Sequence, residues 1–331
     1  MKVQKSNLLT ANGFLAWRVR AVANKKIAIV GPLTGPRSAY GDLLTSAANA
    51  ALSAHPISAK AVSTKAVSTK ATSTQAVSEG VEFVYMDDQA LPHVADAVAK
   101  ALIEEGVTAV IGHFNSACAA TVKDQYENAG IVFVLPASTG DDLTEQPSRY
   151  RFRLCASNTK QCEVVAELLD AQSGSHMVVS DGSPYAEGLA TVLASTYGYR
   201  VIHQENLYEQ TTFDFDNVFL AGTHFSCADM LNHLNRHAFT GRVVGCDDCD
   251  IEEIETLLTP PYSIEVMKLD NGFEFYIRHG VKAVLDILYD DSDVSNLDMA
   301  DRLRCSASSF RFNEYGDNTL STWHHLTIKE Q

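Results

Sequence analysis

The most reactive side chains of this sequence are gathered in "GCDDC", where Cys246 and Cys249 enclose the carboxylates Asp247 and Asp248. A C-x-x-C pair that follows an apolar strand is typical of redox dithiols. A redox dithiol depends on a lowered thiol pKa, whereas the two enclosed acids disfavour a further negative charge and raise that pKa. The motif therefore does not predict a redox centre.

A metal site at this motif would need two further ligands. The sequence has no second C-x-x-C, and the mixed alternative uses His233 and His237, which are spaced i,i+4 on a predicted helix. A solvated helix face is the simpler interpretation of those histidines, so we predict no metal and no cofactor. An odd number of cysteines in a long chain does not resemble a disulfide scaffold, so we expect free thiols. The seven cysteines are Cys118, Cys155, Cys162, Cys227, Cys246, Cys249 and Cys305.

Motifs of catalysis and nucleotide binding are absent. "VSDGSPYAEG" contains no G-x-S-x-G nucleophile elbow. "GPLTGPRSAYG" has glycines, but it lacks both the Lys-Ser/Thr of a P-loop and the G-x-G-x-x-G dinucleotide spacing. We therefore predict that the protein is not an enzyme.

Length and charge limit the remaining classes. A chain of 331 residues suggests two lobes of about 150 residues each, and 46% hydrophobic content is enough for ordinary cores. The net charge of -15 repels phosphate backbones, which argues against nucleic-acid binding. No apolar run approaches the roughly 18 residues of a membrane span, so we predict no membrane insertion.

Short apolar runs alternate with amphipathic segments along most of the chain. "KKIAIVGP", "VEFVYMDD", "VTAVIG" and "IVFVLPAS" read as buried strands, with helices predicted over 38–52, 92–106 and 115–130. A second series follows, with helices over 159–172, 185–198 and 227–239 and strands at "SHMVVSDG", "RVIHQENL", "NVFLAGT" and "RVVGCD". Strands buried on both faces imply mainly parallel sheets covered by helices. Two such series predict two lobes with a cleft between them.

Several polar loops follow the predicted strands, where ligands bind in open parallel sheets. These loops are "GPLTGPRSAYGD", "GHFNSA", "LPASTGDD", "GTHF" and "GCDDCD". A zwitterion such as a free amino acid needs hydroxyls and backbone N–H groups for its carboxylate and one buried acid for its ammonium. Ser116, the carbonyl of Ala137, Thr139 and an acid of the opposite lobe could supply that set.

Two segments do not follow the α/β pattern. Residues 60–79 repeat K-A-V-S-T with a period of five, which fits neither a strand nor a helix face; we expect a solvent-exposed, mobile insertion, or else a short helical extension. Residues 1–24 combine early lysines with "AVA" at 21–23, as in a signal peptide, but polar residues interrupt the apolar middle. This leader is a degenerate signal peptide or a disordered or locally packed segment.

At these residues the sequence resembles the periplasmic branched-chain amino-acid-binding proteins, the leucine/isoleucine/valine type of the type I solute-binding fold. The resemblance is specific from about 26 to 155, through "IAIVGPLTGPRSAYGD", "VYMDDQALPHVADAVAKALIEEGVTAVIGH", "QYENAGIVFVLPAST" and "YRFRLC". It continues more loosely from "YAEGLA" to "GCDD" and returns in "FRFNEYGD".

The resemblance implies roles for first-lobe residues. Tyr40, in "SAYGD", falls on an aromatic wall of the side-chain pocket. Ser116, in "GHFNS", falls on the serine that holds the ligand carboxylate. Ala137 and Thr139, in "PAST", fall on the carbonyl and the threonine that contact ammonium and carboxylate.

It also implies roles for residues of the later part of the chain. Asp247 falls on the acid that pairs with the ammonium, where the family usually has Glu. His224 or Phe225, in "GTHF", fall near a second-lobe aromatic. His279, in "FYIRHG", falls near another aromatic, with Tyr276 as the competing choice.

The chain departs from the family pattern in three ways. The usual disulfide cysteines would lie at Ala90 and Asn115, and both are absent. Asp for Glu shortens the ammonium partner by one methylene group. The stretch between "GCDD" and "GFEFYIRHG" is shorter than usual, so the second lobe is abbreviated.

The resemblance implies a two-lobe α/β fold in which each lobe is a mainly parallel sheet flanked by helices. We expect a leader at 1–24, a first lobe from 25–155 and 266–306, and a second lobe from 156–265 and 307–331. The implied function is capture of a small amino acid, of branched-chain type or a related amide, by hinge closure, and delivery to the permease of an ABC importer in the periplasm. Three alternatives remain. One is a cytoplasmic sensing regulator on the same fold, favoured by the weak leader and missing disulfide; another is a degenerate paralogue that no longer binds, favoured by the low-complexity insert and short second lobe; the third is a C-x-x-C metal or redox protein.

Overall fold

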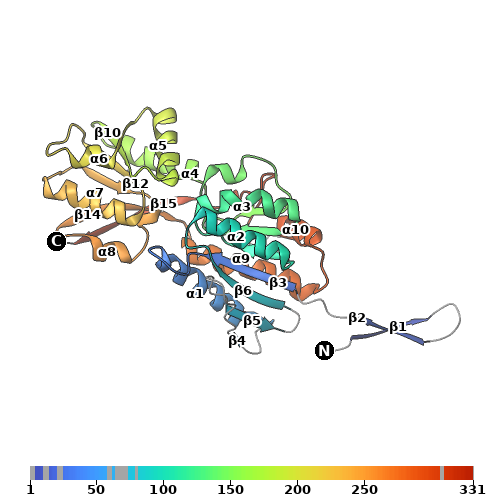
Figure 1. Cartoon of the computed structure of the whole chain (residues 1–331). Coiled ribbons are helices and arrows are strands. Elements are labelled where there is room, and N and C mark those ends of the chain that lie inside the picture. Colours follow the sequence, from blue (N-terminus) through green and yellow to red (C-terminus); the bar gives the residue numbers. More distant parts are fainter. Residues whose placement is uncertain are drawn as a thin grey trace.

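The computed structural model describes residues 4–9, 15–20, 25–57, 62–63, 74–78, 81–305 and 309–330. Its two large sheets lie in two separate lobes, each covered by helices (Figure 1). The predicted two-lobe α/β architecture is therefore confirmed. Within these residues, none of the helices combines the length and apolarity needed to cross a bilayer.

The first lobe is built around β3 (Lys25–Gly31), which pairs in parallel with β6 and β7. Its side chains alternate between two cores: Ile27 and Ile29 pack toward α1 and α9, while Ala28 and Val30 pack toward α2 and α3. The other strands of this seven-stranded sheet are β4 (Val62–Ser63), β5 (Thr74–Ser78), β6 (Val81–Asp87), β7 (Ala109–Ile111), β8 (Val132–Leu135) and β9 (Arg151–Arg153). Its helices are α1 (Ser38–Ala54), α2 (Pro92–Glu104), α3 (Ser116–Ala129), α9 (Gly272–Asp290) and α10 (Asn296–Cys305), with the 3-10 turn η1 (Asp141–Thr144).

The second lobe has a six-stranded sheet in the order β11-β10-β12-β13-β14-β15, parallel except at β15. These strands are β10 (His176–Ser180), β11 (Arg200–His203), β12 (Asn217–Ala221), β13 (Arg242–Gly245), β14 (Tyr262–Leu269) and β15 (Trp323–Glu330). Its helices are α4 (Asn158–Asp170), α5 (Pro184–Tyr197), α6 (Gln204–Tyr208), α7 (His224–Arg236) and α8 (Glu253–Leu257), with the 3-10 turn η2 (Asp247–Cys249). Side chains of Ser157, Ser183 and Thr223 cap α4, α5 and α7, so these helices begin directly after their loops.

The chain passes between the two sheets three times: from β9 to α4, from β14 to α9, and from α10 to β15. The expected boundary at residue 266 falls inside β14, whose whole length to Leu269 belongs to the second sheet. The sequence pattern placed the boundary too early because β14 pairs with a strand from the end of the chain, and such a pairing leaves no local signal.

Two local predictions need correction. The strand predicted over "RVIHQENL" ends at His203, and the remaining residues form the short helix α6. The alternative of a helical extension is wrong for Thr74–Ser78, which pair antiparallel with β6 as the strand β5, and for Val62–Ser63, which pair with β5. The rest of the 60–79 repeat lies outside the described residues.

The N-terminal segment contains a two-stranded antiparallel hairpin, β1 (Gln4–Leu9) and β2 (Leu15–Arg20), in a sheet of its own. It extends from the outer end of the first lobe, away from the second lobe (Figure 1). The remaining residues of the expected leader lie outside the described residues.

A buried arginine ties two of the three crossings together. Arg153, at the end of β9, is 2% exposed, and its Nε donates to Asp317 Oδ1 (2.7 Å) in the segment that leads to β15. Its Nη atoms donate to the carbonyls of Thr139 and Gly140 and to Thr144 Oγ1. One guanidinium therefore donates hydrogen bonds to the loop after β8, to the turn η1 and to the segment of the last crossing.

We expect Arg153→Ala to lower the free energy of unfolding by about 3–5 kcal/mol, because Asp317 loses its cationic partner and the buried carbonyls of Thr139 and Gly140 lose a charged donor. Urea denaturation followed by circular dichroism measures this change. Arg149→Ala is the matched control: Arg149 pairs with Asp301 at 3.5 Å with both side chains more than half exposed, so its loss should cost less than about 1 kcal/mol. Equal stability losses in the two variants would contradict this account.

Candidate functional site

A cavity of about 280 Å³ lies between the two lobes. Its lining comes from loops that follow parallel strands in both sheets, so the carboxyl ends of the strands face one another across it. All five loops expected from the sequence contribute. The lining residues are Arg37, Tyr40, Ala90, Phe114, Asn115, Ser116, Ala117, Ala137, Thr139, Ser183, Pro184, Tyr185, Thr223, Asp247, Asp248 and Phe273.

A bidentate ion pair closes the cavity across the lobes. The Nη atoms of Arg37, in the first lobe, donate to both carboxylate oxygens of Asp248, in the second, at 2.7 and 2.5 Å. The Tyr40 hydroxyl donates to the backbone carbonyl of the same Asp248 (2.7 Å), and the Arg37 guanidinium lies over the Tyr40 ring. Because the two partners belong to different sheets, this arrangement exists only when the lobes are closed.

Asp248 is held in place from within its own lobe. The backbone N–H of His224, at the start of α7, donates to Asp248 Oδ2 (2.8 Å). The His224 ring is fully buried and lies between Asp248 and Glu253. Burial alone would raise the pKa of Asp248, but the charge of Arg37 and the hydrogen bonds from His224 and Arg37 hold it well below its usual range. Asp248 is therefore an ionised carboxylate whose charge is already neutralised.

Asp247 has a different environment from its neighbour. It is 5% exposed, and its Oδ1 accepts hydrogen bonds from Gln161 Nε2 (2.6 Å) and from the Tyr185 hydroxyl. Burial, with a smaller contribution from Cys246, raises its pKa to about 7 against the opposing effect of these two hydrogen bonds. A cation brought into the cavity beside Asp247 would favour its ionised form.

The first-lobe wall presents the start of α3 to the cavity. Ser116 and Ala117 are the first residues of this helix, whose free backbone N–H groups attract anions, and its first turn carries no acid. Ser116 Oγ accepts from the Gly140 N–H (3.1 Å), which leaves the Ser116 hydroxyl proton available to another acceptor. The carbonyl of Ala137 and the side chain of Thr139 lie on the adjacent loop, after β8.

Aromatic rings form the apolar part of the lining. Tyr40 packs against Phe114 with ring centroids 5.0 Å apart, and Phe114 packs against Phe273 at 5.5 Å. Within the described part of the chain, two buried atoms of the lining, Asn115 Oδ1 and Arg37 Nε, have no hydrogen-bond partner. The cavity therefore combines an apolar wall with one unpaired acceptor and one unpaired donor.

Five of the seven residues expected in the site line this cavity: Tyr40, Ser116, Ala137, Thr139 and Asp247. His224 does not line it and instead supports Asp248 from behind, while Phe225 stacks beside the His224 ring. Ala90 and Asn115, the positions of the absent disulfide, both lie in the lining.

The structure does not bring His279 to the cavity. His279 lies on the far part of α9, where its ring stacks on Phe275 and borders a shallow pocket beside His55. Phe273, in the first turn of α9, reaches the cavity instead; six residues further on, a helix has turned by about 240° and advanced about 9 Å. The competing choice, Tyr276, is buried and donates to Asp270 Oδ1 (2.5 Å), next to the crossing from β14.

Sequence reasoning missed five residues that matter here: Arg37, Phe114, Gln161, Tyr185 and Phe273. Arg37 and Phe114 lie within the loops predicted to bind a ligand, whereas Tyr185 lies in the first turn of α5, directly after the loop that follows β10. Its position after β10 was the available signal. Gln161, on α4, had none, because its contact with Asp247 spans 86 positions.

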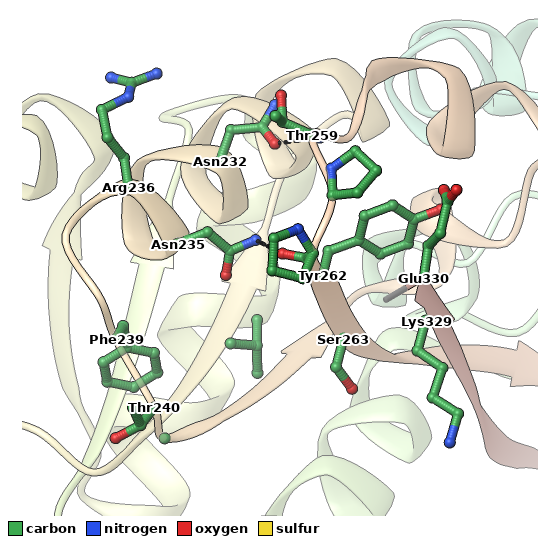
Figure 2. Close-up of a pocket in the computed structure, with 14 residues that line it drawn as sticks. Asn232, Asn235, Arg236, Phe239, Thr240, Thr259, Tyr262, Ser263, Lys329 and Glu330 are labelled. Atoms are coloured by element: carbon green, nitrogen blue, oxygen red, sulfur yellow. Dashed lines mark hydrogen bonds between the residues drawn. The ribbon is translucent and has the colours of Figure 1, made fainter.

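A larger groove of about 770 Å³ lies elsewhere, on the surface of the second lobe. Its lining comes from α7 and the loop after it, from β13, from the loop before β14, and from β14 and β15 (Figure 2). It is lined by one lobe alone and contains none of the residues expected to bind a ligand. The smaller cavity between the lobes is therefore the candidate site.

Curated relatives are binding proteins. The chain is 29% identical over 170 residues to "Leu/Ile/Val-binding protein homolog 2" of Brucella abortus, a match that covers 51% of this chain and 42% of the relative. It is 24% identical over 298 residues to "Amino acid binding protein" of Pseudomonas aeruginosa, with 84% and 75% covered. The chain thus matches less than half the length of the first of these relatives.

Solved structures share the fold. The branched-chain amino acid transporter substrate binding protein LivJ from Streptococcus pneumoniae, in complex with isoleucine, superposes with a TM-score of 0.74 at 17% identity, covering 92% of this chain and 100% of that one. The leucine binding protein LivK from Thermotoga maritima gives the same TM-score over 92% and 99%. At these identities the similarity supports the predicted type I fold.

The family model described as "Periplasmic binding protein" matches residues 25–221, more than half of the chain, and includes the loops that form the first-lobe wall of the cavity. The family inferred from the sequence is thereby confirmed: the chain belongs to the periplasmic binding proteins.

Proposed function

We propose that this protein captures a small amino acid in the cavity between its lobes and presents it to an ABC importer. The observation that carries this proposal is the opposition of two polar walls: the start of α3 with Ser116 on one side and the buried acid Asp247 on the other. A volume of about 280 Å³ lies just below the usual range for drug-sized ligands and suits a small metabolite.

In this arrangement the ligand carboxylate binds at the first-lobe wall. The free N–H groups of α3, the Ser116 hydroxyl and Thr139 surround it, and the helix dipole favours its charge. The ammonium group binds between the carbonyl of Ala137 and Asp247. Since Asp248 is already paired with Arg37, Asp247 is the acid left to balance the ligand.

The ligand side chain would then contact Tyr40, Phe114 and Phe273, an apolar surface that suits an aliphatic group. Names of relatives such as "Leu/Ile/Val-binding protein homolog 2" support this choice. The family description favours a periplasmic location. The name of the similar structure LivJ, a branched-chain amino acid transporter substrate binding protein, supports an importer permease as the partner.

We expect Asp247→Asn to weaken binding of the preferred amino acid by roughly 10- to 100-fold, the value of about 1.5–3 kcal/mol of a charged hydrogen bond. Isothermal titration calorimetry against a panel of amino acids measures the change. Asp250→Asn, one residue beyond the turn and paired with Lys268, is the matched control and should bind as the parent does.

The same titration with the 2-hydroxy acid analogue of the preferred amino acid, which lacks the ammonium group, tests whether Asp247 binds that group. The parent protein should prefer the amino acid strongly over this analogue, and Asp247→Asn should lose most of that preference. Unchanged affinity in the variant would remove Asp247 from the site, whereas no binding of any amino acid by the parent would refute the proposed function.

The Arg37–Asp248 pair predicts a second effect, on closure. Arg37→Met removes one partner of a mostly buried pair, which costs at least about 2 kcal/mol and acts mainly on dissociation, so the ligand should leave roughly 30-fold faster or more. Stopped-flow displacement measures this rate, and small-angle X-ray scattering should show a larger ligand-free radius of gyration.

Arg37→Lys is the conservative control, because it keeps the charge but loses the bidentate geometry. It should fall between the parent and Arg37→Met. A ligand-free radius and a dissociation rate unchanged in Arg37→Met would show that the ion pair does not hold the lobes together.

A further inference from the structure

Three cysteines meet behind the cavity. Cys227 lies near the start of α7, whereas Cys246 immediately precedes the turn η2 and Cys249 ends it. Their sulfur atoms all lie within 4.8 Å of one another, and all three residues are fully buried. From the sequence, His233 and His237 were the only further ligands considered for the C-x-x-C motif, whereas the structure brings Cys227 to it.

The spacing of these sulfur atoms matches a three-coordinate metal site. Metal–thiolate bonds of about 2.3 Å in a trigonal plane place the sulfur atoms about 4.0 Å apart. Cys227 Sγ and Cys246 Sγ are 4.0 Å apart. Small rotations of the Cys249 side chain are all that would be needed to complete the triangle within the observed 4.8 Å.

A fourth ligand is not at hand among the described residues, where the cluster contains these three thiols alone. The nearby His224 has its Nδ1 and Nε2 directed at Asp248 and Glu253. Zinc in structural sites is almost always bound by four ligands, whereas soft thiolates also select Cu(I). All three cysteines are fully buried, so bulk water does not reach the cluster as a fourth ligand.

We propose that Cys227, Cys246 and Cys249 form a three-thiolate site for Cu(I). In the metal-free protein the sulfur atoms of Cys227 and Cys246 lie 3.7 and 3.2 Å from the carbonyl oxygens of Leu220 and Gly222, which accept the thiol protons. Binding releases the proton of each thiol that ligates and forms three sulfur–copper bonds without a change of oxidation state. The ion joins α7 to η2, the turn that carries Asp247 and Asp248.

The test is an anaerobic titration of the reduced full-length protein with Cu(I), supplied from a chromophoric chelator that competes for it. We expect one Cu(I) per chain and a higher melting temperature of the loaded protein, with or without amino acids present. Because amino-acid binding plays no part in this readout, its result is independent of the proposed function.

Cys227→Ser should weaken Cu(I) binding on the order of 100-fold or more, since it removes one ligand outright. Two controls test specificity: Cys305→Ser removes the exposed thiol, and Cys118→Ser removes a buried thiol of the first lobe. Both should bind Cu(I) as the parent does. Equal binding by Cys227→Ser, or equal losses in all three variants, would overturn the proposal.

X-ray absorption at the copper edge of the unsubstituted protein decides the matter even if Cys227→Ser fails to fold. Three sulfur ligands and no nitrogen or oxygen would support the site, whereas two sulfurs or a mixed shell would overturn it. A thiol count in denaturant should return seven free thiols in the metal-free protein. A count of five, with a disulfide between Cys227 and Cys246, would show that this cluster is an oxidised pair instead.

Discussion

The ion pair between Arg37 and Asp248 is the interaction on which the closed arrangement depends. It joins the loop before α1 to the turn after β13, and both side chains are largely withdrawn from water. Desolvating two charges is costly unless further hydrogen bonds complete the arrangement. Here Tyr40 and the backbone of His224 complete it around Asp248. Asp248 thereby holds the lobes together. The neighbouring Asp247 has hydrogen bonds but no cationic partner among the described residues, and in the proposed function it pairs with the ligand.

This division of roles has a consequence for how binding drives closure. A ligand shifts an open–closed equilibrium only by its differential affinity for the closed state. The ion pair contributes to closure whether or not the cavity is filled, so it raises the fraction of closed, ligand-free protein and improves affinity at the same time. A partner protein that recognises the closed form alone would then also bind the ligand-free protein. In the proposed binding mode, the contacts that report the ligand are those of Asp247 and of the start of α3, which the ion pair does not use.

The fold could be predicted from the sequence because its signals are local. Buried apolar runs such as that of β3 predict parallel strands, and parallel strands bring their following loops to one edge, which is why all five expected loops reach the cavity. The misses have non-local causes. His279 was misplaced because a few residues along α9 rotate a side chain away from the site. The roles of Arg37 and Cys227 were missed because their partners, Asp248 and Cys246, are distant in sequence. No spacing rule identifies such pairs.

The turn η2 shows why "GCDDC" has this form. In a 3-10 turn, side chains three positions apart lie on the same side, so Cys246 and Cys249 both face α7 while the two acids between them face the cavity. The thiols and the carboxylates of this motif therefore lie on different sides of one turn, at a fixed angle to each other. Inserting or deleting one residue between the cysteines would break the thiol cluster and would also rotate the acids away from Arg37 and from the ligand. The spacing of the thiols and the placement of the carboxylates are one constraint, because a single turn of backbone sets both.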